Sequence, residues 1–98
     1  MAINIYWSKK ADKRFGSIIE YLEDEWGHHT TSLFVKKVYD FLDILSEFPE
    51  IGTVEKKELN IRGFVIVKQL TIFYQVREDK IILLNFYDNR QRPKRQRF

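Results

Sequence analysis

The sequence contains no cysteine, which excludes disulfide bonds, thiolate metal sites and a cysteine nucleophile. It has only two prolines and four glycines, and the scattered glycines form no phosphate-binding loop. No apolar run approaches the roughly 18 residues that span a bilayer, and the first residues lack the basic and apolar regions of a signal peptide. We therefore expect a cytoplasmic protein that makes no membrane contact.

Histidine is almost as scarce as cysteine, since the only two are the adjacent His28 and His29. Zinc needs three or four convergent ligands, and neighbouring residues in a turn usually point apart. A serine–histidine–acid triad would have to recruit the same pair. We expect neither a bound metal nor a small-molecule cofactor.

What the 98 residues do contain is 44% hydrophobic and 15% aromatic side chains, enough for one small domain with its own core. Residues 1–88 hold 12 Lys and Arg against all 14 Asp and Glu, whereas the last ten residues hold five cations and no acid. We expect a domain over 1–93 and a flexible basic arm over 94–98. Such an arm can meet nucleic acid, an acidic protein or solvent.

The first third of the chain predicts a strand followed by a helix. Residues 2–7 alternate in polarity, which is typical of a strand. Ser8 is a good N-cap, and Gly27 is placed to end the helix at its C-terminal side. Between them one helical stripe of apolar residues recurs at spacings of three and four: Ala11, Phe15, Ile18, Leu22 and Trp26.

A second helix is predicted directly after the first. Thr30 or Thr31 can cap it, and Pro49 stops it. Its main apolar stripe is Phe34, Val38, Phe41, Leu45 and Phe48. The short link over 28–31 predicts that the two helices form an antiparallel hairpin.

The rest of the chain reads as a polar loop over 50–57 and three strands. The strand-like runs cover 61–68, 70–77 and 80–87, with breaks short enough for hairpins. The predicted fold is therefore α+β, in the order β-α-α-β-β-β. The helical hairpin would pack on a four-stranded, mainly antiparallel sheet.

Residues that could carry chemistry gather at the end of the last predicted strand. Arg90 and Arg92 offer planar, permanently charged forks that suit phosphate or carboxylate. Asp88 could orient the fork of Arg90, and Tyr87 could take part in proton transfer. The same residues can instead close off the strand end and pack, and the sequence leaves both interpretations open.

The first predicted helix carries its charges in an unusual order. Lys9, Lys13 and Arg14 lie in its N-terminal half, while its C-terminal half is acidic. This arrangement opposes the helix macrodipole at both ends, at a cost of roughly 0.3–1 kcal/mol per charge at low salt. The helix presents either a solvated face or a surface whose charges serve a partner.

The order of elements resembles the RelE/ParE superfamily of type II toxins, of the plasmid-stabilisation type. Three segments carry the resemblance: 48–52 after the helices, 72–76 as a central strand, and 86–93 as a closing strand with its arginine and proline. The similarity spans residues 1–93. It implies a growth-inhibiting toxin that is neutralised by a cognate antitoxin protein, and we expect the antitoxin to contact Lys9, Lys13 and Arg14.

The superfamily divides by target, and two features favour the branch that inhibits DNA gyrase. The ending from Arg90 to Pro93 is similar to that of the ParE branch, and Thr71 stands where several nucleases carry a second arginine. In this interpretation Arg90, Asp88 and Arg92 contact the target.

The alternative is a metal-free endoribonuclease that cleaves mRNA on the ribosome. Arg90, helped by Arg62 or Lys68, would then hold the phosphate. Tyr87 or Glu58 would move protons. A third interpretation is a nucleic-acid-binding module that uses the basic arm, although no groove-reading helix or aromatic platform is recognisable.

Overall fold

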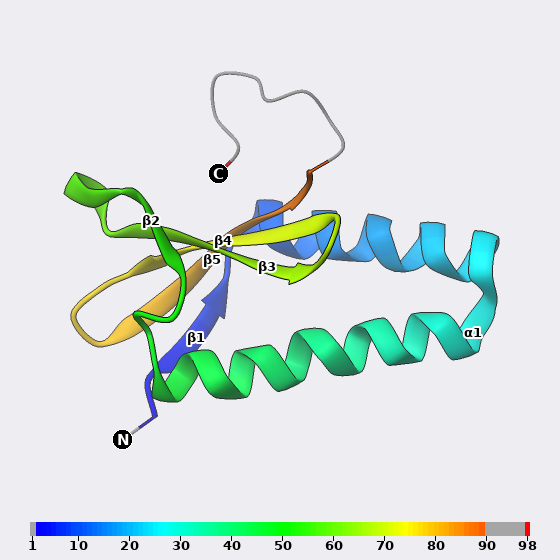
Figure 1. The fold of residues 1–98 in the computed structure, drawn as a ribbon, viewed down its shortest axis with the longest axis horizontal. Helices are drawn as coiled ribbons and strands as arrows, with labels where there is room; N and C mark the ends of the chain where they lie inside the picture. Colours follow the sequence, from blue (N-terminus) through cyan, green and yellow to red (C-terminus); the bar gives the residue numbers. More distant parts are fainter. Residues whose placement is uncertain (1, 90–97) are drawn as a thin grey trace.

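The computed structural model describes residues 2–89 and 98, and over this range the chain forms five strands and one long interrupted helix (Figure 1). The prediction of an α+β fold is confirmed, but the four-stranded sheet was wrong. The elements in order are β1 (Asn4–Trp7), α1 (Lys9–Glu47), β2 (Thr53–Lys56), the short 3-10 helix η1 (Lys57–Leu59), β3 (Ile61–Val67), β4 (Leu70–Val76) and β5 (Lys80–Asp88).

The sheet has the strand order β1-β5-β4-β3-β2. β1 pairs parallel with β5, and every other neighbouring pair is antiparallel. The additional strand is β2, which lies in the segment predicted as a loop. All four of its side chains are exposed, so it shows no apolar alternation. β2 is a strand only because its backbone pairs with that of β3, and the pattern of side chains cannot reveal such pairing.

The helical region also differs from the predicted hairpin. Instead of two helices joined by a link over 28–31, helical structure continues from Lys9 to Glu47 and is interrupted only at Gly27. Gly27 has φ 86° and ψ 178°, a conformation that glycine adopts without strain. There the axis turns back, so that a first arm (9–26) and a second arm (28–47) run side by side in opposite directions (Figure 1). Thr31 lies inside the second arm and donates its hydroxyl to the Gly27 carbonyl at 2.9 Å.

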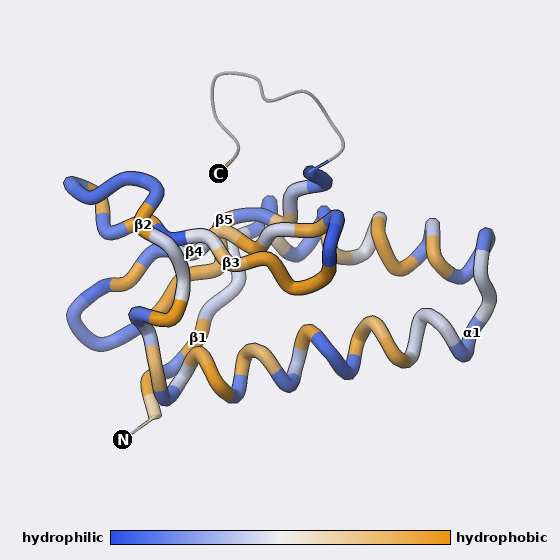
Figure 2. Tube along the Cα trace, viewed as in Figure 1, coloured by the Kyte–Doolittle hydropathy of each residue, from blue (hydrophilic) through white to orange (hydrophobic). Residues whose placement is uncertain are grey.

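Both arms cover the same face of the sheet, and aromatic contacts hold them there. Phe15 of the first arm stacks on Phe86 of β5 at 5.1 Å between ring centroids. Phe41 of the second arm stacks on Phe64 of β3 at 4.4 Å. Hydrophobic residues recur along both arms and gather in the strands beside them (Figure 2). Burying each such ring contributes roughly 1.5–3 kcal/mol.

Each predicted apolar stripe is exposed at its last residue and buried or partly buried before it. Phe15, Phe41 and Leu45 are buried, as expected. Trp26 and Phe48, the last residues of the two stripes, are 67% and 65% exposed. Helical periodicity places them on the inner side of the arms, but it does not show how far the sheet beneath extends.

A bulge in the pairing of β4 with β5 sets which side chains of β5 face the helices. The register passes from Phe73↔Asn85 to Tyr74↔Leu83, so Leu84 is an extra residue. Both Leu83 and Phe86 are therefore fully buried. The Ser8 hydroxyl accepts a hydrogen bond from the Ala11 N–H at 3.0 Å, as an N-cap, and donates to the Leu84 carbonyl at 3.1 Å. One side chain thus ties the helix start to the bulge.

The face of the sheet away from the helices carries a smaller aromatic cluster. Phe73 is fully buried, and its ring lies 6.2 Å from Tyr87 and 5.5 Å from Phe98. Thr71 donates its hydroxyl to the side-chain oxygen of Asn89 at 2.8 Å. The flexible basic arm predicted over 94–98 lies, apart from Phe98, outside the described residues.

Candidate functional site

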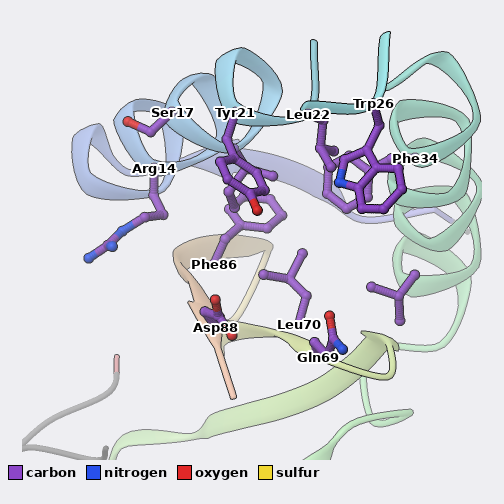
Figure 3. A pocket seen from close by; sticks show the side chains of 12 residues that line it. Arg14, Ser17, Tyr21, Leu22, Trp26, Phe34, Gln69, Leu70, Phe86 and Asp88 are labelled. Atoms are coloured by element: carbon purple, nitrogen blue, oxygen red, sulfur yellow. The ribbon is translucent and has the colours of Figure 1, made fainter. Parts of the chain in front are cut away.

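An apolar groove separates the first arm of α1 from the end of the sheet (Figure 3). Its volume is about 550 Å³. The helical wall comes from both arms, and the floor comes from the β3–β4 turn and the end of β5. The lining residues are Arg14, Ser17, Ile18, Tyr21, Leu22, Trp26, Phe34, Val67, Gln69, Leu70, Phe86 and Asp88.

The groove differs in polarity between its two sides. Arg14 and Asp88 lie toward one side, while Trp26 and Phe34 lie toward the other (Figure 3). Two large side chains of its wall are unusually accessible, since Trp26 is 67% and Tyr21 is 53% exposed. Exposed aromatic side chains beside a cavity are typical anchors for a protein partner.

Of the three cations expected to meet an antitoxin, one reaches this groove. Arg14 lines it, whereas Lys9, in the preceding turn of α1, and Lys13, directly before Arg14, do not. All three side chains are exposed. Lys9 and Lys13 can therefore contribute to the long-range field of this end of the helix, while Arg14 can contact an occupant directly.

Tyr87 and Arg62, two candidates for the ribonuclease set, lie on opposite faces of the sheet. Tyr87 pairs with Thr71 and contacts Phe73, on the face away from the helices. Arg62 lies directly opposite Tyr74, whose side chain belongs to the core beneath α1. Cross-strand neighbours share a face, so the structure does not bring Tyr87 and Arg62 together.

The Arg62 guanidinium is instead engaged with the turn that follows α1. Its Nη1 donates to the carbonyls of Glu50 at 3.1 Å and Gly52 at 2.8 Å. The buried Tyr74 hydroxyl holds the same turn, because it donates to the Pro49 carbonyl at 2.9 Å and accepts from the Gly52 N–H at 2.8 Å. Burial raises the pKa of the Tyr74 hydroxyl, and the Gly52 hydrogen bond and the charge of Arg62 oppose that rise.

The remaining nuclease candidates lie at different ends of the sheet. Lys68 is exposed in the β3–β4 turn, close in register to Tyr87 and Asp88. Arg62, six residues earlier on β3, is roughly 20 Å away along an extended strand. Glu58 is exposed in η1, which precedes β3 and therefore lies at the end with Arg62. Arg90 and Arg92 lie outside the described residues.

Within residues 2–89 and 98, no cluster of acidic or histidine side chains could hold a metal ion. His28 is largely exposed and contacts Glu23 at 3.3 Å and Ser32 at 3.4 Å, just after the turn at Gly27. Over the same range no helix combines the length and the apolarity needed to cross a membrane.

The groove residues Tyr21 and Trp26 were not among the candidates proposed from the sequence. Tyr21 lies off the apolar stripe, and Trp26 was counted as part of the core. A usable signal existed, because a tryptophan at the last position before a helix-ending glycine has few neighbours to cover it. The Gly52–Tyr74 contact had no comparable signal, since it joins residues 22 positions apart.

A family model described as the ParE toxin of the type II toxin–antitoxin system parDE matches residues 5–93. No curated protein sequence matches the chain.

Solved toxin structures share the fold at low sequence identity. One from the chromosomal ParDE system of P. aeruginosa has a TM-score of 0.73 and 13% identity, covering 89% of this chain and 96% of that one. A YoeB/ParE toxin from Agrobacterium tumefaciens has a TM-score of 0.62 and 10% identity, covering 88% and 98%. A heterotetrameric YoeB–YefM toxin–antitoxin complex from Staphylococcus aureus contains a chain with a TM-score of 0.58 and 14% identity, covering 87% and 94%. The chain with this groove belongs to the ParE toxin family, within the RelE/ParE/YoeB superfamily of type II toxins.

Proposed function

We propose that this toxin arrests bacterial growth in the cytoplasm by inhibiting DNA gyrase, and that a cognate antitoxin neutralises it. Membership of the ParE family supports the gyrase target. The observation that carries the preference over mRNA cleavage is the separation of the nuclease candidates. Arg62 lies on the helix-covered face and Tyr87 on the other, so these two candidates do not form one phosphate-binding and proton-transfer set.

The target contacts that we propose are Arg90, Asp88 and Arg92, at and after the end of β5. Asp88 is the last residue of β5 and borders the groove. Arginine forks recognise carboxylate or phosphate groups bidentately, which suits either a protein or a nucleic acid surface of the target complex.

Purified toxin tested in parallel for two activities decides between the targets. Supercoiling by gyrase should stop at toxin concentrations that leave mRNA intact in a translating ribosome extract. Cleavage of mRNA without loss of supercoiling would overturn the gyrase assignment and favour the endoribonuclease. If the toxin is folded by circular dichroism but neither inhibits supercoiling nor cleaves mRNA, both targets are rejected.

For the antitoxin, we propose that an amphipathic segment occupies the groove. Its apolar side would contact Trp26 and Tyr21, and an acidic side chain would meet Arg14. Such a mode suits the groove's division into one charged and one aromatic side. The YoeB–YefM complex supports a protein partner for a toxin of this fold.

The test uses an antitoxin selected because it restores growth to cells that express the toxin. Trp26→Ser should weaken its binding by about tenfold or more, as expected for an aromatic anchor that the partner buries. Leu33→Ser is the matched control, because Leu33 is 54% exposed on the second arm and does not line the groove. Equal losses of affinity in the two variants would show that the antitoxin does not bind in the groove.

A further inference from the structure

A second exposed apolar surface lies at the other end of α1, where the helix ends and the chain turns toward β2. Ile44, Phe48 and Ile51 are 47%, 65% and 39% exposed. Ile44 and Phe48 are one helical turn apart, and the Phe48 N–H donates to the Ile44 carbonyl at 2.9 Å. The Ile51 N–H in turn donates to the Phe48 carbonyl at 3.1 Å. The three side chains therefore emerge from one continuous stretch of hydrogen-bonded backbone.

Carboxylates border this surface on the same stretch. Asp43, Glu47 and Glu50 directly precede the three apolar residues, and all three acids are exposed. Within the part of the chain that the structure describes, none of these carboxylates pairs with a cation. From residue 38 to residue 55 the sequence contains five acids and no Lys or Arg. We call the six residues 43, 44, 47, 48, 50 and 51 the acidic corner.

Folding does not explain the charges of the acidic corner. Glu47 lies in the last turn of α1, which contains no basic residue, and a negative charge there opposes the helix macrodipole. The exposed Phe48 adds apolar surface that water solvates poorly. Both features disfavour the isolated chain, and both become favourable when a cationic and apolar partner covers them.

The backbone beneath the acidic corner is held in place before any partner arrives. Tyr74 fixes the turn through hydrogen bonds to Pro49 and Gly52, and Arg62 fixes it through the carbonyls of Glu50 and Gly52. A turn that is already ordered loses little conformational entropy on binding. The Nη1 atom of Arg62 donates to these two carbonyls, and among the described residues Arg62 forms no ion pair with the carboxylates of the acidic corner.

The charge of this surface limits the class of partner. Nucleic acid and anionic lipid headgroups are repelled by a surface that bears three carboxylates. We propose that the acidic corner binds a basic segment of a partner protein, in which a large apolar side chain between Lys or Arg residues contacts Phe48. It shares no residue with the groove, so this binding goes beyond the proposed function and leaves the groove accessible to the antitoxin.

The probe for this proposal is a fluorescein-labelled dodecapeptide that alternates Lys or Arg with Leu, titrated into the full-length chain by fluorescence anisotropy. Phe48→Ser should weaken binding by about tenfold or more. The double variant Glu47→Lys, Glu50→Lys should do the same and reduce the salt dependence. Amide chemical shifts in the wild type should change mainly over residues 40–52. Circular dichroism melts check that each variant is folded.

Two matched controls distinguish binding at the acidic corner from general effects of surface charge and hydrophobicity. Glu20→Lys with Glu25→Lys makes the same charge change on the first arm, and Leu33→Ser removes another apolar side chain that is more than half exposed. Both should keep the affinity within about twofold. Equal losses in the controls, unchanged binding by Phe48→Ser, or shifts centred on the groove would each overturn the proposal. If the chain self-associates without the probe and Phe48→Ser abolishes that association, the occupant of the acidic corner is a second copy of the chain and not a basic partner.

Discussion

The backbone N–H of Gly52 donates to the hydroxyl of Tyr74, a fully buried side chain on the central strand β4, at a distance of 2.8 Å. The same hydroxyl donates to the Pro49 carbonyl, so one oxygen joins the core to both ends of the turn after α1. A Cβ atom at position 52 would lie 2.6 Å from that oxygen. The turn thus requires a tyrosine at 74 and the smallest residue at 52.

Tyr74→Phe should lower the free energy of unfolding by about 1–3 kcal/mol, because it leaves the Gly52 N–H and the Pro49 carbonyl without their partner. Urea denaturation measures the change. Tyr39→Phe removes a hydroxyl from a ring that is 51% exposed and should cost less than about 0.5 kcal/mol. Similar values for the two variants would show that the Tyr74 hydroxyl does not hold the turn.

Gly52→Ala should also destabilise the protein, by about 1–3 kcal/mol, since the added methyl group meets the Tyr74 hydroxyl and the Gly63 carbonyl, 2.9 Å away. Gly16→Ala is the opposite case. Apart from the adjoining helix backbone and the two neighbouring residues, no atom lies within 4 Å of the added Cβ in the first arm of α1, so alanine should stabilise the helix by up to about 1 kcal/mol. Thermal melting distinguishes the two signs directly.

Stability at alkaline pH should depend on Tyr74 as well. Its pKa in the folded chain is raised by burial, whereas in the unfolded chain it is about 10. The unfolded state therefore loses its proton first as the pH rises. The contribution is complete below about pH 10 and declines from there toward the folded pKa. Unfolding free energies measured from pH 8 to 11 should fall less steeply for Tyr74→Phe than for the wild type, and parallel curves would contradict the assignment.

Reversing the charges of Lys9, Lys13 and Arg14 to glutamate should slow association with the antitoxin and reduce its salt dependence. The reason is that exposed charges near a binding site act chiefly on the rate of encounter. Stopped-flow association at two ionic strengths measures both quantities. Lys36→Glu with Lys37→Glu, on the second arm, is the control. An unchanged association rate would remove the N-terminal turns of α1 from the antitoxin interface.

Arg90→Ala should abolish growth arrest with a loss of stability under about 1 kcal/mol, the range typical of a solvent-screened charge. Arg90→Lys keeps the charge but not the planar fork, so it should restore the arrest only in part. Growth curves and melting temperatures are measured for both variants. A folded Arg90→Ala protein that still arrests growth would exclude Arg90 from the target contacts, and a drop of several degrees would assign it to the fold.

The apolar stripes predicted the helices well because periodicity reports directly which side of a helix is buried. Phe15, Phe41 and Leu45 are buried for that reason. Periodicity carries no information on where the supporting sheet ends, and so Trp26 was placed in the core although it is exposed at the groove. The order of side chains likewise does not show where two strands pair only through their backbones, which is why β2 was predicted as a loop.

The face on which a strand residue lies was harder still to predict. Arg62 was grouped with Tyr87 because the resemblance to ribosome-dependent nucleases implies cations on the sheet together with a tyrosine for proton transfer. Their faces depend on the register of three strands and on the bulge at Leu84, and a shift of one residue moves a side chain to the opposite face. Register comes from tertiary contacts such as the Ser8–Leu84 hydrogen bond, which joins residues 76 positions apart.

The parallel pairing of β1 with β5 has a consequence for synthesis of the toxin. β1 spans Asn4–Trp7, and its only strand neighbour in the described chain is β5, which ends at Asp88. Neither the sheet nor the helix start tied to Leu84 can be completed until β5 has left the ribosome. Any nascent chain that stops earlier lacks the strand on which Trp7 and Phe15 pack through Phe86. We therefore expect a chain whose synthesis stops before β5 to leave β1 unpaired and the inner face of α1 uncovered, and so not to form the toxin fold.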